Sequence, residues 1–174
     1  MPTNDIQKII NLIKKLAFFA YYDSLTKILN RRGFYEKIKE LGILKKNKFK
    51  EKRKINHALI LIDVDNFKQI NDNYDYKTGD KILKSVAQKL KRNFREEDIV
   101  CRWGGDEFLI IMHEVSEKIV NEKIKNLEDE KLSKYNSGLS IAYELFPYGS
   151  NFQSIFKKAN LKLKKIKMIK KIKR

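Results

Sequence analysis

The sequence predicts one domain of the α/β or α+β class, in which helices wrap a central, mostly antiparallel sheet. Runs with helical and with strand periodicity alternate along the 174 residues, a length usual for a single domain. Two β-prone runs flank the Gly-Gly pair at 104–105 and predict a hairpin within this alternation. Hydrophobic residues make up 42% of the chain, enough to form a core between helices and sheet.

The first element is a predicted helix over residues 5–20, with Thr3 or Asn4 as its N-cap. Its apolar residues recur at helical spacing: Ile6, Ile9, Ile10, Ile13, Leu16, Ala17 and Ala20. The stripe is narrow enough for a coiled-coil seam but covers only about two heptads, fewer than the three to four that define one. Residues 1–20 are therefore either a coiled-coil dimer helix or a helix packed on the domain of residues 21–174.

The remaining elements follow from hydrophobic periodicity and turn signals. A lysine-rich helix and loop extend to about residue 56, and residues 57–64 form a buried central strand. The later elements are a helix over 79–94, hairpin arms at 99–101 and 108–112, a helix over 116–127, a strand over 139–145 and a final helix from about residue 151.

The chain carries a formal net charge of +17, which indicates an anionic partner or a solvated lysine-rich surface. Its single cysteine, Cys101, permits no disulfide framework within the chain and fits a reducing compartment. The longest apolar run near the N-terminus covers residues 16–22, whereas a bilayer span takes about 20 residues. We therefore expect a soluble, cytoplasmic protein with no integral membrane segment.

The Gly104–Phe108 segment is the most informative motif. Its two glycines allow a tight turn, and two adjacent carboxylates, Asp106 and Glu107, follow at once. Acids on a rigid turn suit a hard cation such as Mg²⁺. A plain hairpin with a polar tip would show the same local pattern.

A second acidic segment follows the predicted central strand. Asp63 and Asp65 end the strand, where loops at a sheet edge bind ligands, and Lys68 could add a positive charge for phosphate. Asn71 and Asp80 supply an amide and a carboxylate, the pair suited to the edge of a guanine. The alternative is a polar loop with Asp80 as a helix N-cap.

Taken together, these segments resemble the GGDEF family of diguanylate cyclase domains over nearly all of the chain from about residue 21. The likeness rests on motifs in the same order and spacing, within residues 23–34, 63–72, 79–83, 95–108 and 140–142. The family condenses two GTP molecules into cyclic di-GMP and pyrophosphate. Its fold is similar to that of adenylyl cyclases and the polymerase palm.

The resemblance implies a role for each matching residue. Asp63 and Asp106 would ligate Mg²⁺ or Mn²⁺ with help from the Val64 carbonyl. Asp106 is also the candidate base, Glu107 would support the metal site, and Lys68 could stabilise transition-state charge. Further substrate contacts, to phosphates or guanine, are implied for Asn66, Phe67, Lys68, Asn71, Asp80, Gly104, Gly105, Lys167 and Lys171.

Such a domain holds one GTP and must face a second GTP in a symmetry-related copy, so the resemblance implies a homodimer. Arg95 and Asp98 match the family's inhibitory product site, where a guanidinium and a carboxylate would grip cyclic di-GMP. A surface ion pair at a helix end is the alternative for these two residues.

The chain departs from the family pattern at Lys27, Asp75-Tyr76, Ala142 and Asn160. Lys171 stands where the family has arginine, which loses bidentate geometry. The basic tail, residues 157–174, could contact triphosphate, a membrane surface or RNA, or it could be a core-packing helix with a solvated basic face. We favour the last for most of it, with Lys167 as the exception.

Two other functions stay open. A catalytically weak GGDEF-like module would bind GTP or cyclic di-GMP and signal by contact. A basic nucleic-acid-binding protein would show steeply salt-dependent binding, and charge alone gives little reason to expect it.

Overall fold

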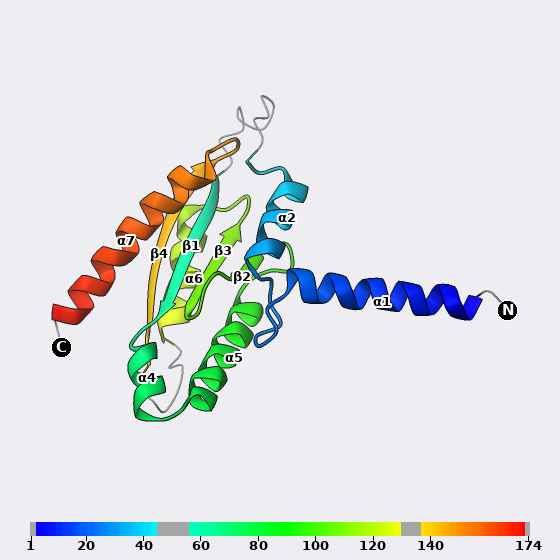
Figure 1. Cartoon of the computed structure of the whole chain (residues 1–174). Helices are drawn as coiled ribbons and strands as arrows, with labels where there is room; N and C mark the ends of the chain where they lie inside the picture. Colours follow the sequence, from blue (N-terminus) through cyan, green and yellow to red (C-terminus); the bar gives the residue numbers. More distant parts are fainter. Residues whose placement is uncertain (1–2, 45–55, 130–136, 173–174) are drawn as a thin grey trace.

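The computed structural model describes residues 3–44, 56–129 and 137–172. Its four-stranded sheet has the order β2-β3-β1-β4, and every neighbouring pair is antiparallel. The strands are β1 (Asn56–Val64), β2 (Ile99–Arg102), β3 (Glu107–Met112) and β4 (Leu139–Pro147). Helices cover the sheet (Figure 1), so the predicted fold class is confirmed.

Strand β1 lies in the middle of the sheet and is buried on both faces. Ala58, Ile60 and Ile62 belong to a core shared with α5 (Tyr76–Asn93) and α6 (Glu117–Asp129). Leu59 and Leu61 point to the opposite face, into a core shared with α2 (Arg31–Leu41) and α7 (Phe152–Ile172). Because successive side chains of a strand alternate between faces, a strand buried on both sides has a continuous apolar sequence.

Helix α1 (Thr3–Tyr21) extends away from the rest of the domain (Figure 1). Thr3 and Asn4 lie inside it, so neither is the N-cap that was predicted. The apolar stripe stays exposed, with Ile9 57% and Ile13 59% accessible. Of the two alternatives for this stripe, packing on its own domain is not found, since the contacts given for α1 within the described residues lie near its C-terminal end, with α2 and the following turn.

Two elements differ from the sequence prediction between Asp65 and Asn93. A short helix, α4 (Phe67–Asn73), occupies a segment where no helix was predicted and where a polar loop was the alternative. Helix α5 begins at Tyr76, three residues earlier than predicted, because the Asp75 side chain caps it by accepting a 2.6 Å hydrogen bond from the Thr78 N–H. Asp80 therefore lies within the helix and is not its cap.

The remaining predicted elements are found close to their expected places. Helix α2 has Asn30 as N-cap, and α6 and β4 extend one or two residues beyond the predicted bounds. Helix α7 packs through Ile155, Ala159 and Leu163 and exposes its basic side, as favoured for most of the tail. No helix in the described ranges combines the length and apolarity needed to cross a bilayer.

Candidate functional site

The two predicted acidic segments meet where β1 ends and β3 begins. Their register pairs Asp63 with Glu107, and the Val64 N–H donates a 3.2 Å hydrogen bond to the carbonyl of Asp106. Asp63 is 4% exposed, whereas the side chain of Asp106 is partly accessible. Residues 43 positions apart in sequence are thus held together by the ladder of an antiparallel pair.

A cleft of about 640 Å³ opens beside this acidic pair. The chain leaves β1 through Asn66, whose φ of 59° is left-handed, and this turn starts α4 along the cleft. The opposite wall is the last part of α7. The lining residues are Asp63, Val64, Asp65, Asn66, Phe67, Lys68, Gln69, Asp106, Lys167, Met168, Lys170 and Lys171.

The two glycines at the hairpin tip were predicted to allow a tight turn, but the backbone there does not need them. Neither Gly104 nor Gly105 has a positive φ, so the turn does not require glycine for its backbone conformation. A Cβ at Gly105 would meet nothing within 4 Å. The second glycine therefore leaves open space beside Asp106.

Arg102 braces this tip, a role that the sequence did not reveal. Its Nε and Nη2 donate to the Gly105 carbonyl at 3.1 and 2.7 Å, and its Nη1 donates to Asp23 at 3.0 Å. Asp23 in turn accepts hydrogen bonds from the backbone N–H and hydroxyl of Thr26. The guanidinium thus ties the turn that carries Asp106 to the segment preceding α2.

Asp23 should make the stability of the domain depend on pH. Burial acts to raise its pKa, but the hydrogen bonds from Thr26 and Arg102 and the Arg102 charge outweigh burial and hold the pKa below the ordinary 3.8. A carboxyl whose folded-state pKa is depressed stabilises the fold above its unfolded pKa, and this contribution is lost as the pH falls through the folded value.

We therefore expect Asp23→Asn to lower the free energy of unfolding at pH 7 and to flatten its decline below about pH 4. Urea unfolding from pH 7 to pH 3 measures both effects. Asp72→Asn, at an exposed carboxylate of α4, is the matched control. An unchanged acid slope in the Asp23 variant would contradict the assignment.

Two lysines of α7 lie on the acids at the end of β1. Lys167 donates a 2.7 Å hydrogen bond to Asp63 Oδ2, and Lys170 donates to Asp65 Oδ2 at 2.8 Å and to the Leu139 carbonyl at 2.6 Å. The other Asp65 oxygen accepts a 2.5 Å bond from the Ser140 hydroxyl. Lys170 is the second residue that the sequence did not single out, because helical spacing alone cannot say which lysines face the cleft.

The charges of this cluster shift one another's protonation. Burial, with the nearby charges of Asp106 and Asp65, raises the pKa of Asp63 despite the bond from Lys167. Desolvation and the charges of Asp63 and Asp106 also raise the pKa of Glu107. Desolvation acts to lower the pKa of Lys167, but its bond to Asp63 and the surrounding acids outweigh it and raise the pKa. The Lys167 ammonium thus favours the ionised form of Asp63 and offsets part of the effect of burial.

The donor set at the strand end fits Mg²⁺ or Mn²⁺. No group of three or more His, Cys, Asp or Glu side chains arranged for a metal occurs within residues 3–44, 56–129 and 137–172. The predicted ligands are two carboxylates, Asp63 and Asp106, and the Val64 carbonyl. This is the chemistry by which Mg²⁺ is commonly held, with one or two carboxylates completed by water and substrate phosphates.

The predicted guanine contacts lie outside the lining of the cleft, on α4 and α5. Asn71 is half-buried, and its Oδ1 is enclosed and accepts no hydrogen bond from the described residues. It lies against Gly79, where a Cβ would be 2.1 Å from that oxygen. Asp80 follows on the exposed side of α5. The two helices pack together, which places Asn71 next to the start of the segment that carries Asp80.

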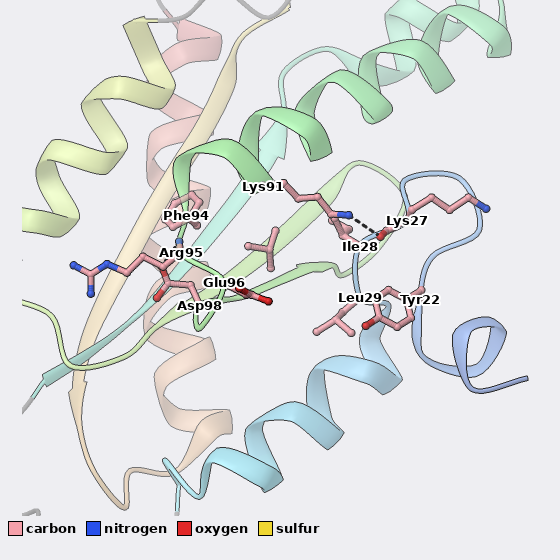
Figure 2. A pocket seen from close by; sticks show the side chains of 10 residues that line it. Tyr22, Lys27, Ile28, Leu29, Lys91, Phe94, Arg95, Glu96 and Asp98 are labelled. Carbon is pink, nitrogen blue, oxygen red and sulfur yellow. Dashed lines mark hydrogen bonds between the residues drawn. The ribbon is translucent and has the colours of Figure 1, made fainter. Parts of the chain in front are cut away.

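Arg95 and Asp98 border a different cavity, of about 480 Å³, between the end of α5 and residues 22–29 (Figure 2). Asp98 is 8% exposed and accepts a 3.0 Å bond from the backbone N–H of Arg95, so the two residues form a tight turn. Burial raises the pKa of Asp98. The Arg95 side chain points away from the other lining residues in Figure 2, and the residue is exposed.

Comparison with known proteins finds matches over most of the chain. The family model described as "Diguanylate cyclase, GGDEF domain" matches residues 20–172. The chain is 36% identical to diguanylate cyclase DosC of Escherichia coli strain K12 over 158 residues, which cover 82% of this chain and 32% of DosC. Diguanylate cyclase DgcM of the same strain is 38% identical over 109 residues, or 63% of this chain and 25% of DgcM. The chain thus spans about a third or less of these relatives.

Solved structures share the fold. The coiled coil and GGDEF domain of DgcB from Caulobacter crescentus, a complex with c-di-GMP, superposes with a TM-score of 0.78 at 20% identity, covering 93% of this chain and 88% of that one. Diguanylate cyclase SiaD from Pseudomonas aeruginosa, in complex with its activator SiaC, gives a TM-score of 0.71 at 24% identity, covering 96% and 65%.

Proposed function

Because the chain belongs to the GGDEF family of diguanylate cyclase domains, we propose that it condenses two GTP molecules into cyclic di-GMP and pyrophosphate as a homodimer. The observation that carries this proposal is the meeting of Asp63 and Asp106 beside a lysine-lined cleft. An acidic pair next to a cluster of ammonium groups is what a triphosphate and its divalent cation require.

The proposed roles follow from position. Asp63, Asp106 and the Val64 carbonyl would hold Mg²⁺ or Mn²⁺, and such an ion would neutralise the triphosphate and make the 3′-hydroxyl more acidic. Asp106 is partly accessible at the open tip, so it can accept the proton of that hydroxyl. Glu107 adds negative charge beside Asp63.

The triphosphate would lie along the cleft between α4 and α7. The turn at Asn66 and Phe67 offers backbone N–H groups, and Lys68, Lys167 and Lys171 provide positive charge from both walls. Gly105 leaves space for the nucleotide to approach Asp106.

Asn71 and Asp80 are proposed to contact guanine. Since a Cβ at residue 79 would overlap Asn71, we expect Gly79→Ala to displace the Asn71 amide and to raise the KM for GTP about tenfold, the loss of one good hydrogen bond. The kcat should change much less. Steady-state kinetics measures this, with Ser85→Ala on the exposed face of α5 as the control. An unchanged KM would remove Asn71 from the guanine site.

The homodimer is proposed to form through α1, the helix that the sequence predicted within residues 1–20. The helix presents its apolar residues to solvent, and its seam has coiled-coil spacing. The DgcB structure, which contains a coiled coil and a GGDEF domain, supports this reading. Two domains joined in this way could bring two GTP molecules together.

Arg95 and Asp98 are proposed as a product-inhibition site for cyclic di-GMP. Arg95 is exposed, and its guanidinium suits a phosphate or a guanine Hoogsteen edge. We also propose a cytoplasmic location, where GTP is available.

The decisive experiment incubates the purified protein with GTP and Mg²⁺ over a range of protein concentrations. We expect cyclic di-GMP to form, with a rate per chain that rises with concentration as dimers form. Ile9→Lys with Ile13→Lys should shift that rise to higher concentration. No product at any concentration would overturn the proposal, and tight binding of cyclic di-GMP without turnover would instead identify a signalling module.

A further inference from the structure

Lys167 and Lys170 contact neighbouring acids but are held very differently. Lys170 has two acceptors, Asp65 and the Leu139 carbonyl, and its side chain is 39% exposed. Among the residues that the structure describes, Lys167 donates to one acceptor, Asp63, and its side chain is 47% exposed. Both acids are nearly enclosed, with side chains 6% and 9% exposed. Lys170 is therefore fixed by its surroundings, whereas Lys167 can leave Asp63 with the loss of one contact.

A positive charge beside Asp63 offsets the cost of its burial. Asp63 is buried at the end of β1, and the negative charges of Asp106 and Asp65 also act on it. A buried carboxylate surrounded by like charges is costly unless a counter-ion compensates it. Lys167 is that counter-ion, and it contacts the same carboxylate that is proposed to bind the divalent cation.

We propose that Lys167 is an exchangeable counter-ion of Asp63 that moves to the triphosphate on nucleotide binding, while Lys170 anchors α7, so that the divalent cation and the nucleotide bind as one unit. This inference rests on the proposed function, because it assumes that the cleft receives a nucleotide with its metal ion. Before nucleotide binds, Lys167 compensates the charge of Asp63, whereas Lys170 positions α7.

The free energy of this exchange favours joint binding. If a divalent cation alone displaced Lys167 from Asp63, the ammonium would lose the one hydrogen-bond acceptor that it has among the described residues and would face a second cation close by. If a triphosphate entered alone, it would meet the charges of Asp63 and Asp106. With both present, Lys167 exchanges one anionic partner for another, and Asp63 stays compensated.

The exchange needs no movement of the helix. Ala159 and Leu163 hold α7 against the sheet, and Lys170 ties its last turns to β4 and β1. Lys167 lines the same cleft as Lys68 and Lys171. The ammonium of a lysine sits on a flexible stem of four carbons, so it can move within the cleft by a change of rotamer.

The test compares Mn²⁺ binding with and without a non-hydrolysable GTP analogue, by electron paramagnetic resonance and calorimetry. In the wild-type protein the analogue should raise Mn²⁺ affinity about tenfold or more, within the usual range of coupling between sites. Lys167→Met should tighten Mn²⁺ binding without nucleotide about tenfold, weaken the analogue by a similar factor and so reduce the coupling.

Three further variants make the test specific. Lys165→Met, on the exposed side of α7, should behave as wild type. Lys170→Met should weaken the analogue without tightening Mn²⁺ binding, and Lys170→Arg should restore most of the loss. Asp63→Asn should remove Mn²⁺ binding both with and without the analogue. Lys167→Gln repeats the main measurement should the methionine variant fold poorly, which circular dichroism checks.

Unchanged or weaker Mn²⁺ binding in the Lys167 variants would overturn the exchange, as would a wild-type protein that binds Mn²⁺ equally with and without the analogue or in neither case. These readouts do not depend on turnover. An inactive protein that shows the opposing shifts would refute the cyclase activity and leave the exchange intact.

Discussion

Replacing Asp106 by alanine is expected to lower the rate of cyclic di-GMP formation on the order of 10³-fold while leaving the domain folded. The side chain is partly accessible at the hairpin tip, and its negative charge repels that of Asp63. Its removal takes away a proposed metal ligand and base. It also relieves repulsion, so thermal stability should stay the same or rise.

Asp106→Asn serves as a matched variant that keeps the size of the side chain and removes only its charge. The turnover assay and a thermal melt, measured on the same preparations, separate the two effects. Unfolding of the alanine variant would contradict the view that Asp106 contributes to chemistry and not to stability. Substantial activity would remove it from the catalytic site.

Replacing Phe108 by alanine should have the opposite effect, a loss of about 3–5 kcal/mol in the free energy of unfolding. This ring lies only two residues after Asp106, but it is fully buried in the core between the sheet and α5. A small domain is stable by about 5–15 kcal/mol, so the variant should be largely destabilised.

Urea unfolding measures this loss, with the midpoint and slope compared to those of the wild type. Tyr76→Ala is the control, because that ring is 79% exposed and its removal should change stability by about 0.5 kcal/mol or less. A change of less than 1 kcal/mol in the Phe108 variant would mean that the hairpin does not pack as described.

Periodicity predicted most of the fold because the strongest patterns reflect burial. The continuous apolar run of β1 and the spaced apolar residues of α5 each match the face or faces that pack in the core. The short helix α4 was not predicted, since seven mostly polar residues give no periodic signal and depend on the preceding left-handed Asn66. The start of α5 was set three residues late because Asp75 was not recognised as its cap.

The acidic half of the site could be predicted because its motifs lie in short stretches of sequence. The contacts that hold it could not. Arg102 reaches Asp23 across 79 positions, and Lys170 reaches Asp65 across 105. Such pairs depend on the final packing of several elements, and a chain with 39 lysines and arginines offers too many candidates to choose among.

The place of α7 in the chain has a consequence for folding. Asp63 and Lys167 are 104 positions apart, and β1 pairs with β4, which lies between these two residues in the sequence. Contacts between distant segments form slowly, since they must overcome the entropy of closing long loops. During synthesis the acids at the end of β1 and in the hairpin emerge well before Lys167 and Lys170, so the cleft that they line would be among the last features to form. A partly folded chain would then have the acidic pair without the lysines that contact it.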